Sequence, residues 1–132
     1  MKSPQDPARL LQNYAYALSR LDAQALDDLI ADHTLLEIPF LKPRRLVGRS
    51  EIAAAHREIA DNLEVVDCRL EHSLAGDGHA IAEGRLEVTR RGDSPRSLEF
   101  GLVVECDGSG LRRLSLYCDT RNLRRWSDKT IQ

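Results

Sequence analysis

The chain has 132 residues, of which 42% are hydrophobic and 30% are charged; its net charge is -2 and its mean hydropathy is -0.41. This length suits one domain with a proper core, so we expect residues 1–132 to form a single domain, and the composition excludes a disordered chain. The charge gives no general attraction to nucleic acid or to anionic lipid, and no apolar run approaches the roughly 20 residues of a membrane helix. We expect neither a nucleic-acid partner nor a membrane partner.

Helical spacing dominates the first part of the chain. Apolar residues recur every three or four positions from Leu10 to Leu21, with Pro7 in the first turn, and again over residues 23–31 behind a capping Asp22. The N-terminal residues lack the apolar stretch and cleavage site of a secretory signal, so a cytoplasmic location is expected.

A short strand over residues 34–39 and a loop over residues 42–45 follow these helices. Ser50 is the expected N-cap of a third helix that runs to about Asp61.

From Leu63 onward the apolar period changes from helical to two. The pattern predicts strands that turn at Gly and Asp clusters, over residues 63–74, 79–90, 97–106 and 111–120. Sequential strands with tight turns indicate an antiparallel meander, and helices gathered before them indicate an α+β fold.

The three cysteines are odd in number and have no CxxC spacing. Each shares strand parity with apolar neighbours, which favours buried, reduced thiols at Cys68, Cys106 and Cys118. No set of His, Asp and Glu has the spacing of a metal site, so no metal and no cofactor are expected.

The order of elements and several short phrases together resemble the nuclear transport factor 2-like superfamily, in particular its SnoaL-like, ketosteroid isomerase-like and limonene epoxide hydrolase-like members. The phrases are Tyr14 with Ala17-Leu18, Leu29-Ile30-Ala31-Asp32, Glu37-Ile38-Pro39, Gly48-Arg49, Asp107-Gly108-Ser109-Gly110 and Tyr117-Cys118-Asp119. The resemblance implies an α+β cone, with three N-terminal helices packed on the concave face of a curved, mostly antiparallel sheet, a cavity between them for a small apolar molecule, and a homodimer through the outer sheet face.

The resemblance also implies catalytic positions, and most of them are not filled. Steroid isomerases need a carboxylate base and an oxyanion hole of a tyrosine and a protonated acid. Tyr14 matches the tyrosine, but Ile38 stands at the base and Leu102 at the acid. Glu37 is one residue away from the base position, which on a strand reverses the direction of the side chain.

The epoxide hydrolase pattern is also incomplete. Arg85 and Glu87 resemble its arginine and aspartate pair, with glutamate in place of aspartate, but Leu116 stands where the last-strand carboxylate would be. In a SnoaL-like cyclase the acid/base carboxylate lies near a strand end, which leaves Asp119 or Glu87 as candidates.

Two placements of Arg85 and Glu87 are open. The alignment with the family points both side chains into the cone, where a buried charged pair is usually functional. The alternation of Ala82, Leu86 and Val88 instead makes these three the apolar face, which turns Arg85 and Glu87 toward solvent or a partner subunit.

The remaining candidates also have two interpretations each. Tyr14 is either a hydrogen-bond donor to a ligand or a core tyrosine, and His56, between Ile52 and Ile59 on the third helix, is either a ligand or base residue or an edge-of-core histidine. Asp119 either acts chemically or ends the last strand, and Trp126 either closes the cone mouth or lies at a subunit contact. The chain is thus expected to be a small-molecule-binding protein that is either a cofactor-free acid/base enzyme or a non-catalytic module.

Overall fold

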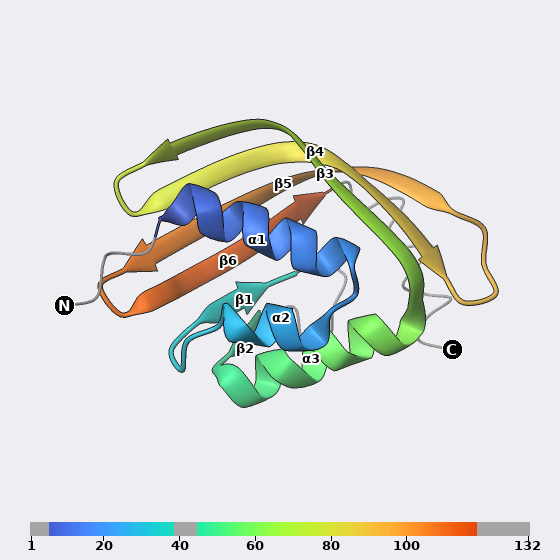
Figure 1. Cartoon of the computed structure of the whole chain (residues 1–132), viewed down its shortest axis with the longest axis horizontal. Coiled ribbons are helices and arrows are strands. Elements are labelled where there is room, and N and C mark those ends of the chain that lie inside the picture. Colours follow the sequence, from blue (N-terminus) through green and yellow to red (C-terminus); the bar gives the residue numbers. More distant parts are fainter. Residues whose placement is uncertain (1–5, 39–44, 119–132) are drawn as a thin grey trace.

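The first two helices begin where the sequence predicts. The computed structural model describes residues 6–38 and 45–118 (Figure 1). Helix α1 spans Pro7–Ser19, and the side chain of Asp6 accepts a hydrogen bond of 3.1 Å from the backbone N–H of Ala8. Helix α2 spans Ala23–Asp28, and Asp22 accepts 3.1 Å from the N–H of Ala25, which confirms the predicted cap.

Helix α3 spans Arg49–Asn62 and begins differently from the prediction. Gly48, not Ser50, is its N-cap, with a φ of 92° that favours glycine, so the prediction of Ser50 was wrong. The carboxylate of Glu51 in the first turn accepts a hydrogen bond of 3.0 Å from the N–H of Val47, a favourable position for an acidic residue.

The described strands form one sheet in the order β2-β1-β6-β5-β4-β3. Their bounds are β1 Leu35–Glu37, β2 Arg45–Val47, β3 Leu63–Gly76, β4 His79–Arg90, β5 Arg96–Asp107 and β6 Gly110–Cys118. All neighbours pair antiparallel except β1 and β6, which are parallel. Strand β2 was not predicted, because its three residues are too few to show a period of two; the predicted loop's Arg45 belongs to it.

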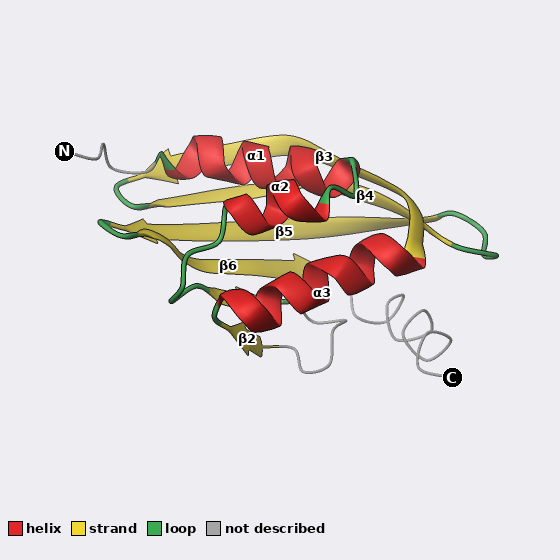
Figure 2. Ribbon diagram, turned by 60° about the horizontal axis from the view of Figure 1, so that its bottom comes forward, coloured by secondary structure: helices red, strands yellow, loops and turns green. Residues whose placement is uncertain are grey.

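The three described helices cover one face of this curved, unclosed sheet (Figure 2). This arrangement confirms the α+β cone with helices on the concave face of a mostly antiparallel sheet. Apolar side chains of α1, α2 and α3 meet alternate residues of the strands to form the core, among them Leu11, Leu26, Ile52, Leu102 and Leu114.

A bulge bends β3 across the helices. Leu70 pairs with Gly84 and His72 pairs with Glu83, so Glu71 is an extra residue on β3. A Cβ atom on Gly84 would lie 1.8 Å from the backbone oxygen of Arg69, which means that only glycine fits opposite the bulge.

Candidate functional site

Three polar side chains from three helices join in the interior of the helical layer. The hydroxyl of Tyr14 on α1 lies 2.9 Å from Nε2 of His56 on α3. Nδ1 of His56 lies 2.9 Å from Oδ1 of Asp27 on α2. His56 is 0% exposed and Tyr14 is 2% exposed, whereas the side chain of Asp27 is 18% exposed. We call this set the Tyr14–His56–Asp27 chain.

Each helix places its member by ordinary helical spacing. Tyr14 follows Leu10 and Leu11 on the buried stripe of α1, and His56 lies one turn from Ile52 and Ile59. Asp27 lies beside buried Leu26 on the short helix α2. The apolar stripes that build the core therefore carry these polar groups into it.

The hydrogen bonds fix the protonation of the histidine. A carboxylate accepts hydrogen bonds and does not donate them, so Nδ1 of His56 carries the proton that faces Asp27. Burial lowers the pKa of His56 below its usual range, against the opposing effects of the hydrogen bond and charge of Asp27. The imidazole is therefore neutral at pH 7, and its Nε2 accepts the proton of the Tyr14 hydroxyl.

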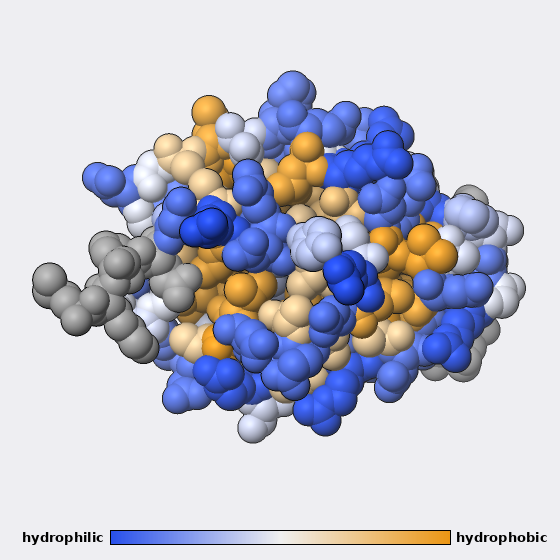
Figure 3. Space-filling view, in the orientation of Figure 1, coloured by the Kyte–Doolittle hydropathy of each residue, from blue (hydrophilic) through white to orange (hydrophobic). Residues whose placement is uncertain are grey.

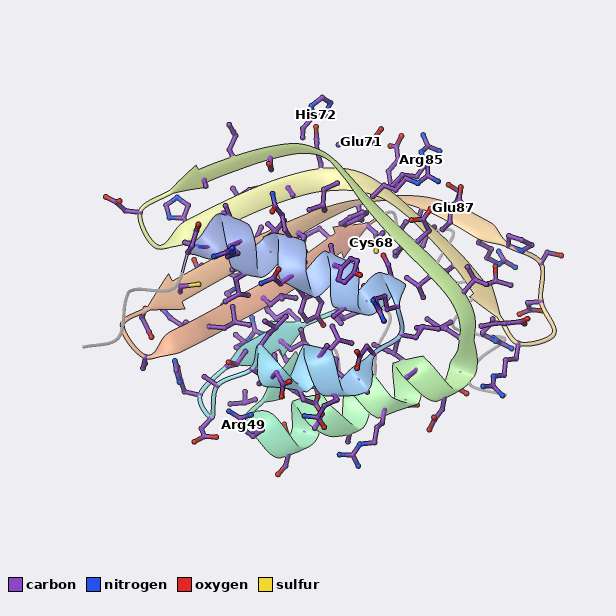
Figure 4. The ribbon with its side chains drawn as sticks, in the orientation of Figure 1. Arg49, Cys68, Glu71, His72, Arg85 and Glu87 are labelled. Carbon is purple, nitrogen blue, oxygen red and sulfur yellow. The ribbon has the colours of Figure 1, made fainter. Side chains whose placement is uncertain are left out.

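Tyr14 stays a phenol in this setting. Burial raises its pKa, and the neighbouring Cys68 and Asp27 add smaller electrostatic contributions in the same direction. Cys68 lies on the helix side of β3, where Figure 4 labels it, and burial raises the pKa of its thiol to about 12. The thiol is therefore protonated at neutral pH and is a poor nucleophile.

Arg85 and Glu87 lie on the other side of the sheet. Burial alternates along β4, with Leu86 and Val88 buried and Arg85 and Glu87 exposed. Arg85 lies 3.8 Å from Glu99 and 3.4 Å from Ser97 on the same outer surface. Figure 4 shows both side chains pointing away from the helices. The inward placement considered from the sequence is wrong for this chain, because the apolar residues of β4 occupy the concave face.

Glu37 also faces outward, as the one-residue step from Ile38 implies. Its carboxylate accepts hydrogen bonds from Ser115 at 2.7 Å, Arg45 at 2.8 Å and Arg113 at 2.9 Å. The Ser115 hydrogen bond is the largest of the effects that lower the pKa of Glu37 to about 2, with the two arginines adding to it. This cluster ties β1, β2 and β6 together, outside the cone.

The other predicted positions divide into two groups. Leu102 and Leu116 are buried on the concave face and pair across β5 and β6, so they are apolar parts of the cone interior. Asp119 and Trp126, with Pro39, lie outside the described residues. On the concave side of the described sheet, the Tyr14–His56–Asp27 chain is thus the candidate polar site, and it unites two of the predicted residues.

Asp27 was missed from the sequence. It stands three residues before buried Ile30 and four after Ala23, which puts it on the inner flank of its helix. That spacing was the available signal. The next residue, Asp28, is also an aspartate, but its side chain is exposed. The choice between them depends on where α2 packs against α3.

Some other features of the described residues bear on function. Cys68, Cys106 and Cys118 are of intermediate exposure rather than fully buried. Within ranges 6–38 and 45–118, no group of three or more His, Cys, Asp or Glu side chains is arranged to hold a metal ion. No helix in this part of the chain is long and apolar enough to cross a membrane.

A family model described as a SnoaL-like domain matches residues 11–110, which is more than half of the chain. None of the curated protein sequences matches this chain significantly.

Solved structures with the same fold are numerous, and the three described below share little sequence with this chain. A proposed SnoaL-like polyketide cyclase from Shewanella denitrificans OS-217 is 14% identical, with a TM-score of 0.78 over 93% of this chain and 97% of its own. A protein of unknown function with the nuclear transport factor 2-like fold from Burkholderia pseudomallei K96243 is 14% identical, with a TM-score of 0.79 over 92% and 96%. An epoxide hydrolase of the limonene epoxide hydrolase-like type from M. tuberculosis is 16% identical, with a TM-score of 0.76 over 94% and 87%. These similarities establish the fold.

Proposed function

Because the chain belongs to the SnoaL-like domain family, we propose that it binds a small, largely apolar molecule inside the cone and acts on it by cofactor-free proton transfer. The observation that carries this proposal is the Tyr14–His56–Asp27 chain, a pair of 2.9 Å hydrogen bonds in an otherwise apolar interior. Isolated polar groups are costly to bury, and convergent ones in an apolar setting are typical of acid/base sites.

In this proposal His56 is the base and Tyr14 carries protons to it. A substrate O–H or acidic C–H gives its proton to the Tyr14 oxygen as the Tyr14 O–H gives its own to Nε2 of His56. The substrate is left as the anion, and the imidazolium is held by the carboxylate of Asp27 at Nδ1. Return of the proton along the same path, to the same or another substrate atom, restores the enzyme without a cofactor.

The route by which a substrate reaches Tyr14 is part of the proposal. Figure 3 shows apolar surface in the middle of the helix-bearing face, bordered by polar residues. The partly exposed apolar residues packed against the core include Leu18 on α1, Leu21 in the connection to α2 and Leu29 directly after α2. An apolar molecule that enters between the helices would meet these residues before the buried phenol.

A screen of small apolar compounds by thermal shift tests the binding part, because a ligand of the folded state raises the melting temperature. Any hit is then assayed for turnover with Tyr14→Phe and His56→Gln, each of which we expect to lose about 10²- to 10⁴-fold in kcat. Glu87→Gln is the matched control, because it removes a carboxylate charge from the outer face and should leave kcat unchanged. Full turnover by Tyr14→Phe would remove the proton path from the mechanism.

A non-catalytic binding module of the same fold is the second candidate. The apolar identity of Leu102 and Leu116 on the concave face favours it, because relatives with known chemistry are expected to place carboxyl groups at these positions. A ligand that binds and is never turned over, with an affinity that Tyr14→Phe alters, would support this candidate against the enzyme.

We also propose that the chain forms a homodimer through the outer face of the sheet. Large apolar residues are exposed there on three strands: Val47 on β2, Ile81 on β4 and Tyr117 on β6. Ile81 directly opposes the exposed Leu74 of β3, and adjoining exposed apolar residues on one face are typical of an interface. Light scattering should give twice the chain mass for the wild type and the monomer mass for Ile81→Asp. Tyr16→Asp, an equally drastic change on exposed α1, should remain dimeric.

A further inference from the structure

The Tyr14–His56–Asp27 chain has a direction. Nδ1–H of His56 donates to Asp27, so Nε2 has a lone pair and no proton. The hydroxyl of Tyr14 therefore donates to Nε2, and its single proton is used in that hydrogen bond. What the phenol still offers to a third partner is the lone-pair side of its oxygen.

The described surroundings of Tyr14 leave this acceptor capacity open. Among the described residues, the Tyr14 hydroxyl makes one hydrogen bond, to His56, and the thiol of the nearby Cys68 is a weak donor. The concave positions of the middle strands carry apolar side chains, among them Ala82, Leu86 and Leu102. No strong donor from these strands competes for the phenol oxygen.

From this polarity we infer that the site selects a neutral apolar molecule that carries a hydroxyl group, and that the hydroxyl donates its hydrogen bond to the Tyr14 oxygen. The inference rests on the proposed function, because it names the class of ligand for the same site. A ketone would place its oxygen lone pairs against those of Tyr14, with no proton between them.

Charged donors fit this site less well than a neutral hydroxyl. An ammonium ion would have to leave water for an interior whose one described carboxylate, that of Asp27, already accepts from His56. A carboxylate ligand could only accept hydrogen bonds from its partners, and it would lie near the negative charge of Asp27. An alcohol or phenol supplies the donor without this desolvation cost.

The direction of the hydrogen bonds is testable without any ligand. In the ¹⁵N NMR spectrum of the protein at pH 7, Nδ1 of His56 should show the shift of a protonated imidazole nitrogen and Nε2 that of an unprotonated one. Tyr14→Phe should shift the Nε2 signal and leave Nδ1 protonated. A proton on Nε2 in the wild type would overturn the inference, because Tyr14 would then be free to donate to a ligand.

The selectivity is tested with two probes that share a skeleton and differ only in donor capacity, 1-indanol and 1-indanone, titrated by calorimetry. We expect the alcohol to bind about tenfold more tightly than the ketone, which is the usual effect of one hydrogen bond against a buried acceptor left unpaired. Tyr14→Phe should bring the two dissociation constants together, and Tyr16→Phe, an exposed tyrosine on the same helix, should not.

The outcomes separate this inference from the proposed function. A ketone that binds as tightly as the alcohol, or more tightly, overturns the hydroxyl preference and leaves a binding cone in place. Failure of both probes, and of a wider thermal-shift screen, would remove the proposed function and the preference with it.

Discussion

Tyr14 and His56 are 42 positions apart in the sequence, and a buried 2.9 Å hydrogen bond joins them across two helices. Asp27 extends the bond to the third helix, so all three described helices share one polar connection inside an apolar layer. Such a connection stabilises one packing of the helices when all of its members are paired, and it becomes costly when one is removed.

Tyr14→Phe should lower the free energy of unfolding by about 1 to 3 kcal/mol, because it leaves Nε2 of His56 buried without a partner. Chemical denaturation monitored by circular dichroism measures this. Tyr16→Phe is the control, since Tyr16 is 64% exposed and surface changes of this kind usually stay within about 0.5 kcal/mol. Equal effects of the two variants would mean that the Tyr14 hydrogen bond contributes nothing net.

The stability of the protein should fall as the pH is lowered below about 6.5, the ordinary pKa of histidine. Burial holds the pKa of His56 lower in the folded state, with Asp27 acting against burial, so the unfolded chain takes up a proton first and gains stability from it. One histidine can lower the free energy of unfolding by at most about 1.4 kcal/mol for each pH unit between pH 6.5 and its lowered pKa in the folded state.

Denaturation midpoints measured from pH 7.5 to 5 with the wild type, His56→Gln and His72→Gln test this. His56→Gln should flatten the slope, whereas His72→Gln, which removes a histidine from the exposed part of β3, should keep it. An unchanged slope in His56→Gln would assign the pH dependence to other groups.

The parts of the fold that depend on local pattern could be predicted from the sequence. Helical periodicity placed α1 and α3, and the switch to a period of two at Leu63 placed the long strands within a few residues. The three-residue strand β2 was missed because its pairing with β1 is a tertiary contact.

The candidate site was predictable only in pieces. Tyr14 and His56 were singled out from their apolar stripes, but no spacing rule relates residues on separate helices. Asp27 could not be told from Asp28 without the packing of α2. For Arg85, the alternation of β4 predicted the outward placement and the alignment with the family predicted the inward one; the alternation was right, because a strand keeps its apolar residues on the covered face.

Gly84→Ala should destabilise the protein strongly, at or above the upper end of the roughly 1 to 3 kcal/mol usual for overpacking. The new Cβ would lie 1.8 Å from the main-chain oxygen of Arg69, so the bulge in β3 itself would have to move. Gly101→Ala is the matched control, because a Cβ there meets its nearest atom at 3.9 Å on the neighbouring strand. Thermal unfolding of both variants measures the difference, and equal melting temperatures would contradict a glycine requirement at the bulge.

Glu37→Gln should remove a separate component of stability, one that is lost in acid. The hydrogen bond from Ser115 and those from Arg45 and Arg113 lower the pKa of Glu37 to about 2, so the folded state holds this group ionised where the unfolded chain binds a proton. Its contribution is complete above an unfolded-state pKa of about 4.3 and disappears as the pH falls through 2. Denaturation from pH 6 to 2 should therefore show a shallower acid slope in Glu37→Gln than in the wild type. Glu99→Gln is the control, because the exposed carboxylate of Glu99 lies 3.8 Å from Arg85, and this variant should keep the wild-type slope. An acid slope that Glu37→Gln leaves unchanged would show that the Glu37 cluster does not stabilise the pairing of β1 with β6.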